Sequence, residues 1–151
     1  MITLIASILL CQTVTGTVVS ITDGDTIIVR ADGKSLKVRL DGIDAPERRQ
    51  AFGTAARDRL GELVFGRTVT LETRGTDRYG RTIAVVLVDR MDINYKLVAE
   101  GLAWHYAAYS RDKALADAEK AARAGKRGLW GDKSPVAPWD YRKRPATKKA
   151  A

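Results

Sequence analysis

The chain has 151 residues, of which 45% are hydrophobic, so it is long enough to bury the core of one domain. It carries 26 Lys and Arg residues against 18 Asp and Glu residues, a net charge of +8 at pH 7. This excess favours a polyanionic partner, with nucleic acid first and an anionic membrane second. Because Cys11 is the only cysteine and His105 the only histidine, a disulfide within the chain, a Cys-based zinc site and a His-cluster metal site are excluded. Any bound metal therefore needs oxygen ligands, which Ca²⁺ and Mg²⁺ prefer.

Residues 1–12, MITLIASILLCQ, form an apolar run that is too short to span a bilayer as a helix. The run resembles the hydrophobic part of a secretion signal, although no Lys or Arg precedes it and no A-x-A cleavage site follows. A lipoprotein anchor at Cys11 would need a small residue before it, and Leu10 is large. The alternative is an N-terminal strand. We favour the signal interpretation and expect a secreted or periplasmic protein without a stable membrane anchor. The alternative is a cytoplasmic protein.

Five segments have β-branched or alternating apolar residues between turn signals, the pattern of strands. They are residues 14–21, 26–31, 35–42, 68–73 and 82–88. The sequences Asp23-Gly24-Asp25 and Asp32-Gly33 are typical of turns, and the second predicts a tight hairpin between the second and third strands.

Three helices are predicted from apolar residues at helical spacing. They run from Phe52 to Gly66, from an Asp92 cap to Gly101, and from a Ser110 cap to Gly125 or Gly128. The order of strands and helices indicates the α+β class. It is typical of a small, closed, five-stranded Greek-key barrel with about three helices packed at one side and end.

The last part of the chain, from Asp132, is rich in Pro, Lys and Arg and has no periodicity, so we expect an unstructured end. Trp130 and Trp139 are expected to hold this segment against the barrel. The sequence is thus divided into a signal-like segment (1–12), one domain (13–131) and a basic extension rich in Pro and Lys (132–151).

Carboxylates gather where the third strand ends, in the sequence VRLDGIDAPERR. Asp44 and Glu47 follow this strand, and a hairpin would bring Asp25 beside them. Crowded carboxylates suit a hard divalent cation, so Asp25 and Asp44 are candidate metal ligands. The alternative is an acidic surface cluster paired with Arg39, Arg48 and Arg49. Spacing alone favours this alternative, because surface ion pairs are common.

The sequence TDRYGRT, residues 76–82, places two arginines in the loop before the fifth strand. A guanidinium can bind a phosphate through two parallel hydrogen bonds, so Arg39 and Arg81 could hold one phosphoryl group from opposite sides. Taken alone, the loop is more typical of a solvated turn. It supports a phosphate-binding site only in combination with the acidic residues.

Six stretches together resemble the staphylococcal-nuclease-like (thermonuclease) family: ITDGDTIIV, VRLDGIDAPE, FGTAARDRL, DRYGRTIAVV, LVAEGLAW and GLWGDKSPVAPWDYRK. They occur in that family's order and spacing and cover about residues 14–142. Each is weak alone, but six in register are a strong signal. The resemblance implies an OB-fold barrel and an endonuclease that hydrolyses DNA and RNA with Ca²⁺ and leaves 3′-phosphate ends.

The resemblance also implies which residues hold the metal. Asp25 and Asp44 match the calcium-binding carboxylates, and Ala45 matches the ligand that coordinates through its backbone carbonyl. That position is often Thr in the family, but a carbonyl ligand does not depend on the side chain. Asp23 matches an acid in the outer shell of the metal.

Three further positions match catalytic residues of the family. Glu47 matches the glutamate near the attacking water, while Arg39 and Arg81 match the two phosphate-binding arginines. The matching substrate-binding residues are Arg78, Tyr79 and Tyr109. The family's pair of tyrosines spaced by one residue is absent, since WHYAAY offers Tyr106 and Tyr109 instead, and this departure affects base stacking and sequence preference.

A second class of function fits the same resemblance: an OB-fold module that binds nucleic acid without catalysis, as in family members that have lost acidic residues. The sequence retains the complete set of Asp25, Arg39, Asp44, Glu47 and Arg81, and this favours the enzyme. We expect DNA and RNA as substrates, Ca²⁺ as cofactor, a monomer, and no obligate protein partner.

Overall fold

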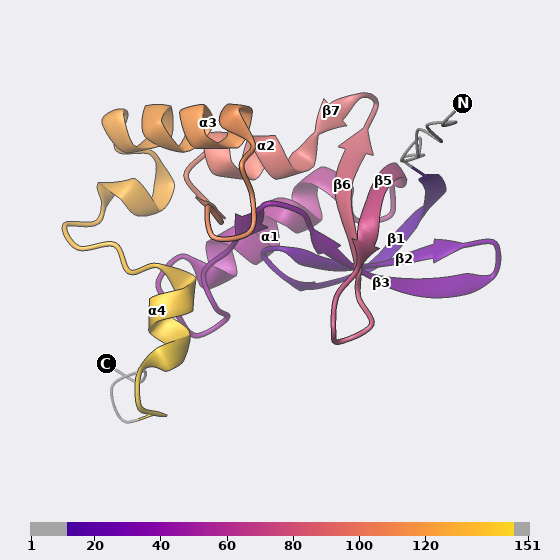
Figure 1. Ribbon diagram of the computed structural model, residues 1–151, viewed down its shortest axis with the longest axis horizontal. Helices are drawn as coiled ribbons and strands as arrows, with labels where there is room; N and C mark the ends of the chain where they lie inside the picture. The colour runs from indigo at the N-terminus through magenta and orange to yellow at the C-terminus, as the bar shows by residue number, and fades with distance from the viewer. Residues whose placement is uncertain (1–11, 147–151) are drawn as a thin grey trace, which may run out of the picture.

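A computed structural model describes residues 12–146, so residues 1–11 of the predicted signal-like segment lie outside the described chain. Five strands form a closed barrel in the order β3-β2-β1-β5-β6 (Figure 1). They are β1 (Thr13–Asp23), β2 (Thr26–Ala31), β3 (Lys34–Leu40), β5 (Thr68–Thr76) and β6 (Thr82–Val88). Neighbours in this order are antiparallel, and a parallel pairing of β3 with β6 closes the barrel. The predicted five-stranded α+β barrel is confirmed.

Three two-residue strands complete the β-structure. β7 (Met91–Asp92) extends the barrel sheet beside β6. β4 (Ile43–Asp44) pairs with β8 (Trp104–His105) in a separate two-stranded sheet. The β4–β8 pairing matters for the site, because it fixes the backbone of Asp44 directly after the barrel strand β3.

The barrel core is made of alternating side chains that point inward, as the period of two predicts. Ile27 and Val29 of β2 are completely buried, as are Val38 of β3, Leu71 of β5 and Val86 of β6. Burying an aliphatic side chain of this size contributes roughly 1.5–3 kcal/mol. This core makes the barrel a rigid support for the residues at the strand ends.

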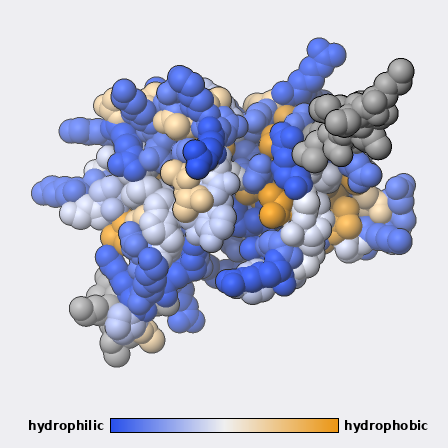
Figure 2. Space-filling view, viewed as in Figure 1, coloured by the Kyte–Doolittle hydropathy of each residue, from blue (hydrophilic) through white to orange (hydrophobic). Residues whose placement is uncertain are grey.

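Four α-helices and one 3₁₀-helix lie at one side and end of the barrel (Figure 1). They are α1 (Gly53–Val64), α2 (Ile93–Ala99), α3 (Lys113–Ala124), η1 (Gly128–Gly131) and α4 (Pro138–Lys143). None of the helices in the described range 12–146 has the length and apolarity needed to cross a membrane. On the face shown in Figure 2 the surface is mostly hydrophilic, and apolar residues appear in small separate patches.

The cap of α3 differs from the prediction. Asp112, rather than Ser110, accepts the hydrogen bonds of the first turn, from the backbone N–H groups of Ala114 and Leu115. The Ser110 hydroxyl instead bonds to the ring of His105 and accepts the N–H of Asp112. A carboxylate and a hydroxyl two residues apart are both good caps, so sequence could not separate them.

The expectation of an unstructured end from Asp132 is wrong for residues 138–143, which form α4. Pro138 occupies the first turn of this helix, where its missing N–H costs nothing. Tyr141 is buried against the body of the protein, and Trp139 packs edge-to-face on Trp104 with the ring centroids 5.4 Å apart. With six residues, α4 is too short to show a helical period in the sequence. Its aromatic residues hold it against the protein, as predicted from the sequence for Trp139.

Candidate active site

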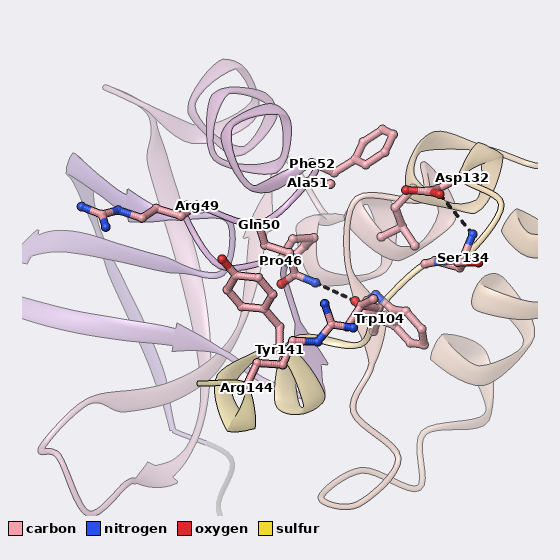
Figure 3. Close-up of a pocket in the computed structure, with 13 residues that line it drawn as sticks. Pro46, Arg49, Gln50, Ala51, Phe52, Trp104, Asp132, Ser134, Tyr141 and Arg144 are labelled. Carbon is pink, nitrogen blue, oxygen red and sulfur yellow. Dashed lines mark hydrogen bonds between the residues drawn. The ribbon is translucent and has the colours of Figure 1, made fainter. Parts of the chain in front are cut away.

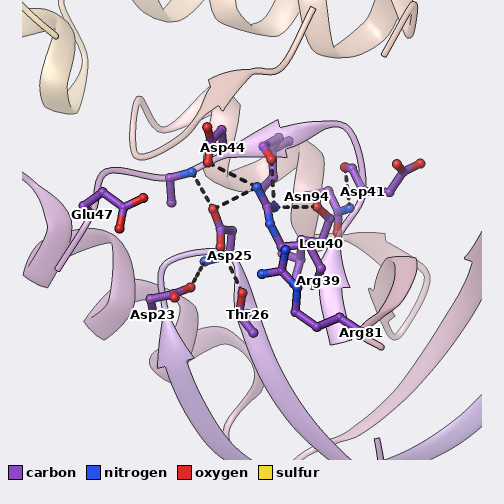
Figure 4. Close-up of polar contacts among 12 residues, drawn as sticks. Asp23, Asp25, Thr26, Arg39, Leu40, Asp41, Asp44, Glu47, Arg81 and Asn94 are labelled. Atoms are coloured by element: carbon purple, nitrogen blue, oxygen red, sulfur yellow. Dashed lines mark hydrogen bonds and ion pairs between the residues drawn. The ribbon is translucent and has the colours of Figure 1, made fainter. Parts of the chain in front are cut away.

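A cleft of about 740 Å³ lies between the barrel strand ends, the β5–β6 loop and α4. All ten residues that the sequence singled out line it: Asp23, Asp25, Arg39, Asp44, Ala45, Glu47, Arg78, Tyr79, Arg81 and Tyr109. They come from segments up to 86 residues apart in the chain, so the fold brings together what the sequence separates. Figure 4 shows the acidic part of this cleft.

Two buried aspartates form the floor of the cleft. Asp25 is 7% exposed and Asp44 is 2% exposed. The backbone N–H of Ala45 donates to Asp25 Oδ2 at 2.7 Å, and the Thr26 hydroxyl donates to Asp25 Oδ1 at 3.1 Å. The Asp25 carboxylate is therefore fixed by the chain segment that carries Asp44.

Arg39 links the two carboxylates (Figure 4). Its Nη2 atom lies 3.3 Å from Asp25 Oδ2 and 3.1 Å from Asp44 Oδ1. Its Nη1 atom donates to the backbone carbonyls of Leu40 at 2.9 Å and Ile43 at 2.8 Å. Only 14% of the side chain is exposed. The cluster is thus buried, not the exposed surface cluster considered as the alternative.

The other arginines of that alternative take no part in the acidic cluster. The Nη2 atom of Arg48 donates to the backbone carbonyl of Thr22 at 2.9 Å, and Arg49 lines a separate small pocket (Figure 3). Arg39 is therefore the member of the predicted trio that faces the carboxylates.

Two glycines allow the close packing that brings the acidic residues together. A Cβ on Gly24 would lie 2.8 Å from the side chains of Ala45 and Ala56, so only glycine lets the β1–β2 turn approach them. A Cβ on Gly53 would collide with the backbone carbonyl of Glu47. The start of α1 therefore packs directly on the Glu47 loop, which presents its carboxylate to the cleft.

The pKa values of the carboxylates reflect burial first, and then the charges around each group. Burial and the neighbouring Asp25 raise the pKa of Asp23 to about 6. Burial also raises the pKa of Asp44, although Arg142 and Arg39 oppose the shift. Burial would raise the pKa of Asp25 as well, but the charge of Arg39 and the hydrogen bonds to this carboxylate hold it below its usual range. Burial therefore disfavours the charged forms of Asp23 and Asp44, whereas Arg39 keeps Asp25 ionised.

The donor set fits a hard divalent cation. Asp25 and Asp44 supply two buried carboxylates, and Ala45, which directly follows Asp44 in the chain, supplies a backbone carbonyl. Within residues 12–146, no three His, Cys, Asp or Glu side chains form a ready-made set of ligands. A metal here would therefore combine the two carboxylates with backbone or water oxygens, the ligands that Ca²⁺ accepts.

The opposite wall of the cleft is the β5–β6 loop. Asp77 organises it, because its carboxylate accepts the backbone N–H groups of Tyr79 and Arg81 at 2.9 and 3.0 Å. The same carboxylate accepts Nε–H of Arg81 at 2.6 Å. These hydrogen bonds hold the pKa of Asp77 below its usual value, although burial opposes the shift. The turn that carries Arg81 therefore also fixes the orientation of its side chain.

Exposed aromatic rings flank the arginines. Tyr79 is 68% exposed, and the guanidinium carbons of Arg78 and Arg81 lie 4.9 and 5.5 Å from its ring centroid. Tyr109 is 80% exposed and packs edge-to-face on Tyr106 at 4.7 Å. Exposed rings next to cations are suited to stacking on the bases of single-stranded nucleic acid.

Sequence reasoning did not assign Arg142 or Asp77 to the site, although both line the cleft, and Arg142 reaches the acids. Its Nη2 atom donates to Asp44 Oδ2 at 2.7 Å, and its Nη1 atom donates to Glu47 Oε1 at 2.8 Å. Although partial burial opposes the charge, these contacts raise the pKa of the Arg142 guanidinium. The residue lies 95 positions after Glu47, and its place in the stretch GLWGDKSPVAPWDYRK, which resembles the family, was the one available signal.

Comparisons with known proteins agree with this geometry. Residues 37–132 match the model of the family described as staphylococcal nuclease homologue. An "Uncharacterized endonuclease" of Escherichia coli O157:H7 is 43% identical over 136 residues, which cover 89% of each chain. A similar protein of Haemophilus influenzae with the same description is 42% identical over 84% of this chain and 72% of its own. A "Micrococcal nuclease" of Shigella flexneri is 40% identical over 85% of this chain and 80% of its own.

Proposed function

Because the chain belongs to the staphylococcal nuclease family, we propose that it is a calcium-dependent nuclease acting on DNA and RNA. The observation that carries the proposal is the cleft itself. The guanidinium groups of Arg39 and Arg81 and the buried carboxylates of Asp25 and Asp44 line it together, on a protein with a net charge of +8. A basic protein attracts the phosphate backbone, and the acids provide a place for a metal. We further propose that the products carry 3′-phosphate ends.

Asp25, Asp44 and the Ala45 carbonyl would hold the Ca²⁺, which supplies Lewis-acid polarisation of a phosphate oxygen and orders nearby water. The rest of the reaction needs only side chains of this cleft. Glu47 accepts a proton from the attacking water as its oxygen bonds to phosphorus. The bond from phosphorus to the 5′ oxygen breaks, and that oxygen takes a proton from solvent water. The products are a 3′-phosphate and a 5′-hydroxyl.

The two arginines stabilise the negative charge that grows on the phosphate during the attack. Arg39 donates from the barrel side of the cleft and Arg81 from the β5–β6 loop. Donors already in place before the reaction are effective, because they need not reorganise as the charge develops. Tyr79 and Tyr109 would stack on neighbouring bases and fix the strand.

The test is hydrolysis of single-stranded DNA and RNA by the purified protein, in Ca²⁺ and in excess chelator. We expect cleavage with Ca²⁺ and none with chelator. The fragments should prime a polymerase only after phosphatase treatment, since a 3′-phosphate blocks extension. Cleavage that survives the chelator, or ends that extend directly, would contradict the mechanism. Tight binding without cleavage in any metal would identify a non-catalytic binding module.

We also propose that the enzyme is a monomer and acts outside the cytoplasm. Apolar residues at 1–12 support the second statement, and the described part of the chain offers no membrane-crossing helix. Fractionation of cells that express the full chain and a chain lacking residues 1–12 would test it. Equal distribution of the two forms would contradict a signal. Sedimentation of the purified protein tests the monomer.

A further inference from the structure

Arg142 makes three hydrogen bonds to two acids of the cleft. Its Nη1 atom contacts Glu47 Oε1 at 2.8 Å and Asp44 Oδ1 at 3.2 Å, and its Nη2 atom contacts Asp44 Oδ2 at 2.7 Å. The guanidinium therefore bridges a proposed metal ligand and the proposed acceptor of the water proton. Nothing in the chemistry described above uses this residue.

Helix α4 is held in place by contacts that do not involve Arg142. Tyr141 is 8% exposed, and the Trp139 ring stacks on Tyr106 with an interplanar angle of 2°. The Gln50 side chain donates to the backbone carbonyl of Val136 just before the helix, at 2.6 Å (Figure 3). Arg142 therefore stands beside the acids whenever α4 is docked, as a fixed part of the cleft wall.

The Glu47 carboxylate needs such a partner. Its side chain is 41% exposed, and a free glutamate loses about 1.5–2 kcal/mol of rotamer entropy when it is ordered. The Glu47 N–H is held by the Gln50 side chain at 3.0 Å, which fixes the backbone but not the carboxylate. Among the hydrogen bonds found in residues 12–146, the one from Arg142 orients the carboxylate.

We propose that Arg142 is a positioning residue of the active site, which ties the Glu47 carboxylate to Asp44 so that it faces the attacking water. This inference rests on the proposed nuclease function and on the role of Glu47 in it. The residue works through Glu47 and does not need to touch the substrate. Misplacing a catalytic group by about 1 Å can cost about 10²-fold in rate.

The contact of Arg142 with Asp44 helps to position Glu47, but it also weakens the binding of a cation at Asp44. The guanidinium neutralises part of the charge that a cation at Asp44 would otherwise meet, and like charges a few ångströms apart repel. Removing Arg142 therefore favours metal binding while it frees Glu47. We therefore expect an Arg142 variant whose α4 stays docked to bind Ca²⁺ more tightly and to turn over more slowly.

The experiment compares Arg142→Gln and Arg142→Lys with Lys143→Ala as the matched control. Lys143 is the next cation on α4, 78% exposed, and its nearest acid is Asp140 at 4.0 Å. With Arg142→Gln we expect kcat to fall about 10- to 100-fold and KM to stay within about threefold. Calcium affinity, measured by calorimetry without substrate, should rise about tenfold. The Lys variant should be intermediate, and the control should match wild type.

A double-mutant cycle shows whether Arg142 acts through Glu47. If it does, adding Arg142→Gln to a Glu47→Gln enzyme should slow turnover by less than about twofold, because the group it positions is already gone. Full additivity of the two losses would overturn the proposal. So would unchanged turnover with tighter Ca²⁺, which would make Arg142 merely a competitor of the metal. Unchanged calcium affinity would also overturn it.

The two proposals fail in different ways. A wild-type enzyme that cleaves DNA with Ca²⁺, beside an Arg142→Gln variant identical to it in rate and calcium affinity, overturns only the role of Arg142. A wild-type protein that is inactive with every divalent metal overturns the proposed function and this inference with it. Thermal unfolding of each variant, checked against Lys143→Ala, identifies any loss of the fold.

Discussion

The two walls of the cleft carry the same kind of residue in different ways. On the barrel wall, Arg39 is 14% exposed and is held by two buried carboxylates and two backbone carbonyls. On the loop wall, Arg81 is 25% exposed and pairs with Asp77, four residues earlier in the same turn. The first guanidinium is part of the fold, whereas the second belongs to a self-contained turn. Mutations on the two walls should therefore affect stability and activity differently.

The largest effect is expected at Glu47, on the barrel wall. Glu47→Gln keeps the shape and loses charge and basicity, while Glu47→Asp keeps the charge and retracts it by one methylene. If Glu47 accepts the water proton, both variants should lower kcat by roughly 10²–10⁴-fold with substrate binding near wild type. Single-turnover hydrolysis in saturating Ca²⁺ measures this.

A Gln variant within a few-fold of the wild-type rate would remove Glu47 from the mechanism. It would also leave the metal and the arginines to carry the reaction. If Glu47 only supports its loop, Gln should be nearly silent, and Asp should lower the melting temperature. The two outcomes are separated by measuring the rate and the thermal unfolding of the same samples.

Substitutions of Arg39 and Arg81 test the difference between the barrel wall and the loop wall most directly. Arg39→Ala and Arg81→Ala should each lower turnover by about 10²–10³-fold, the range for losing one donor that was already in place. Arg39→Ala removes the largely buried cation that pairs with both Asp25 and Asp44, and should also cost about 3–5 kcal/mol of unfolding free energy. Arg81→Ala removes a partly exposed pair and should cost less than about 1 kcal/mol. Denaturant unfolding measures the difference.

Arg→Lys at either position should restore only part of the rate, since an ammonium lacks the planar fork that binds phosphate through two hydrogen bonds. Full activity of a Lys variant would contradict the assignment of that arginine. Equal stability losses at the two positions would contradict the division of the cleft into a structural wall and a self-contained turn.

The same division explains what could be predicted from the sequence. Asp77 and Arg81 lie four residues apart, and Asp25 and Arg39 lie on strands joined by a recognisable Asp-Gly turn. Short-range patterns and a family resemblance were therefore enough to place them in one cleft. Arg142 reaches the acids through the packing of Trp139 and Tyr141, and neither periodicity nor spacing encodes that contact.

The proposed metal ligands should show a smaller effect that is specific to calcium. Asp25→Asn and Asp44→Asn each remove one ligand charge from the barrel wall, so calcium affinity should fall by about tenfold or more. Calorimetric titration of the metal-free variants measures it. Unchanged affinity in both variants would place the ligands elsewhere. Asp77→Asn, on the loop wall, is the matched control and should leave calcium affinity unaltered.

The smallest effect is on the pH dependence of stability, to which Asp23 on the barrel wall and Asp77 on the loop wall should contribute with opposite sign. Burial and Asp25 raise the pKa of Asp23 to about 6, above its unfolded value of 3.8, so the folded protein binds this proton more tightly. The contribution of Asp23 to the stability of the metal-free protein should therefore fall as pH rises from about 4 to about 6. The Asp23→Asn variant should not show this loss. Compared with wild type, its stability should therefore be higher above pH 6 than at pH 4.

On the loop wall, hydrogen bonds lower the pKa of Asp77 against the effect of burial. Its stabilising contribution is therefore present above the unfolded value of 3.8 and is lost as pH falls below it. Asp77→Asn should be less stable than wild type at pH 6 and should approach it near pH 3. Urea unfolding of both variants from pH 3 to pH 7, without metal, gives the two slopes. Slopes of the same sign would show that the acids of the two walls are not in different electrostatic environments.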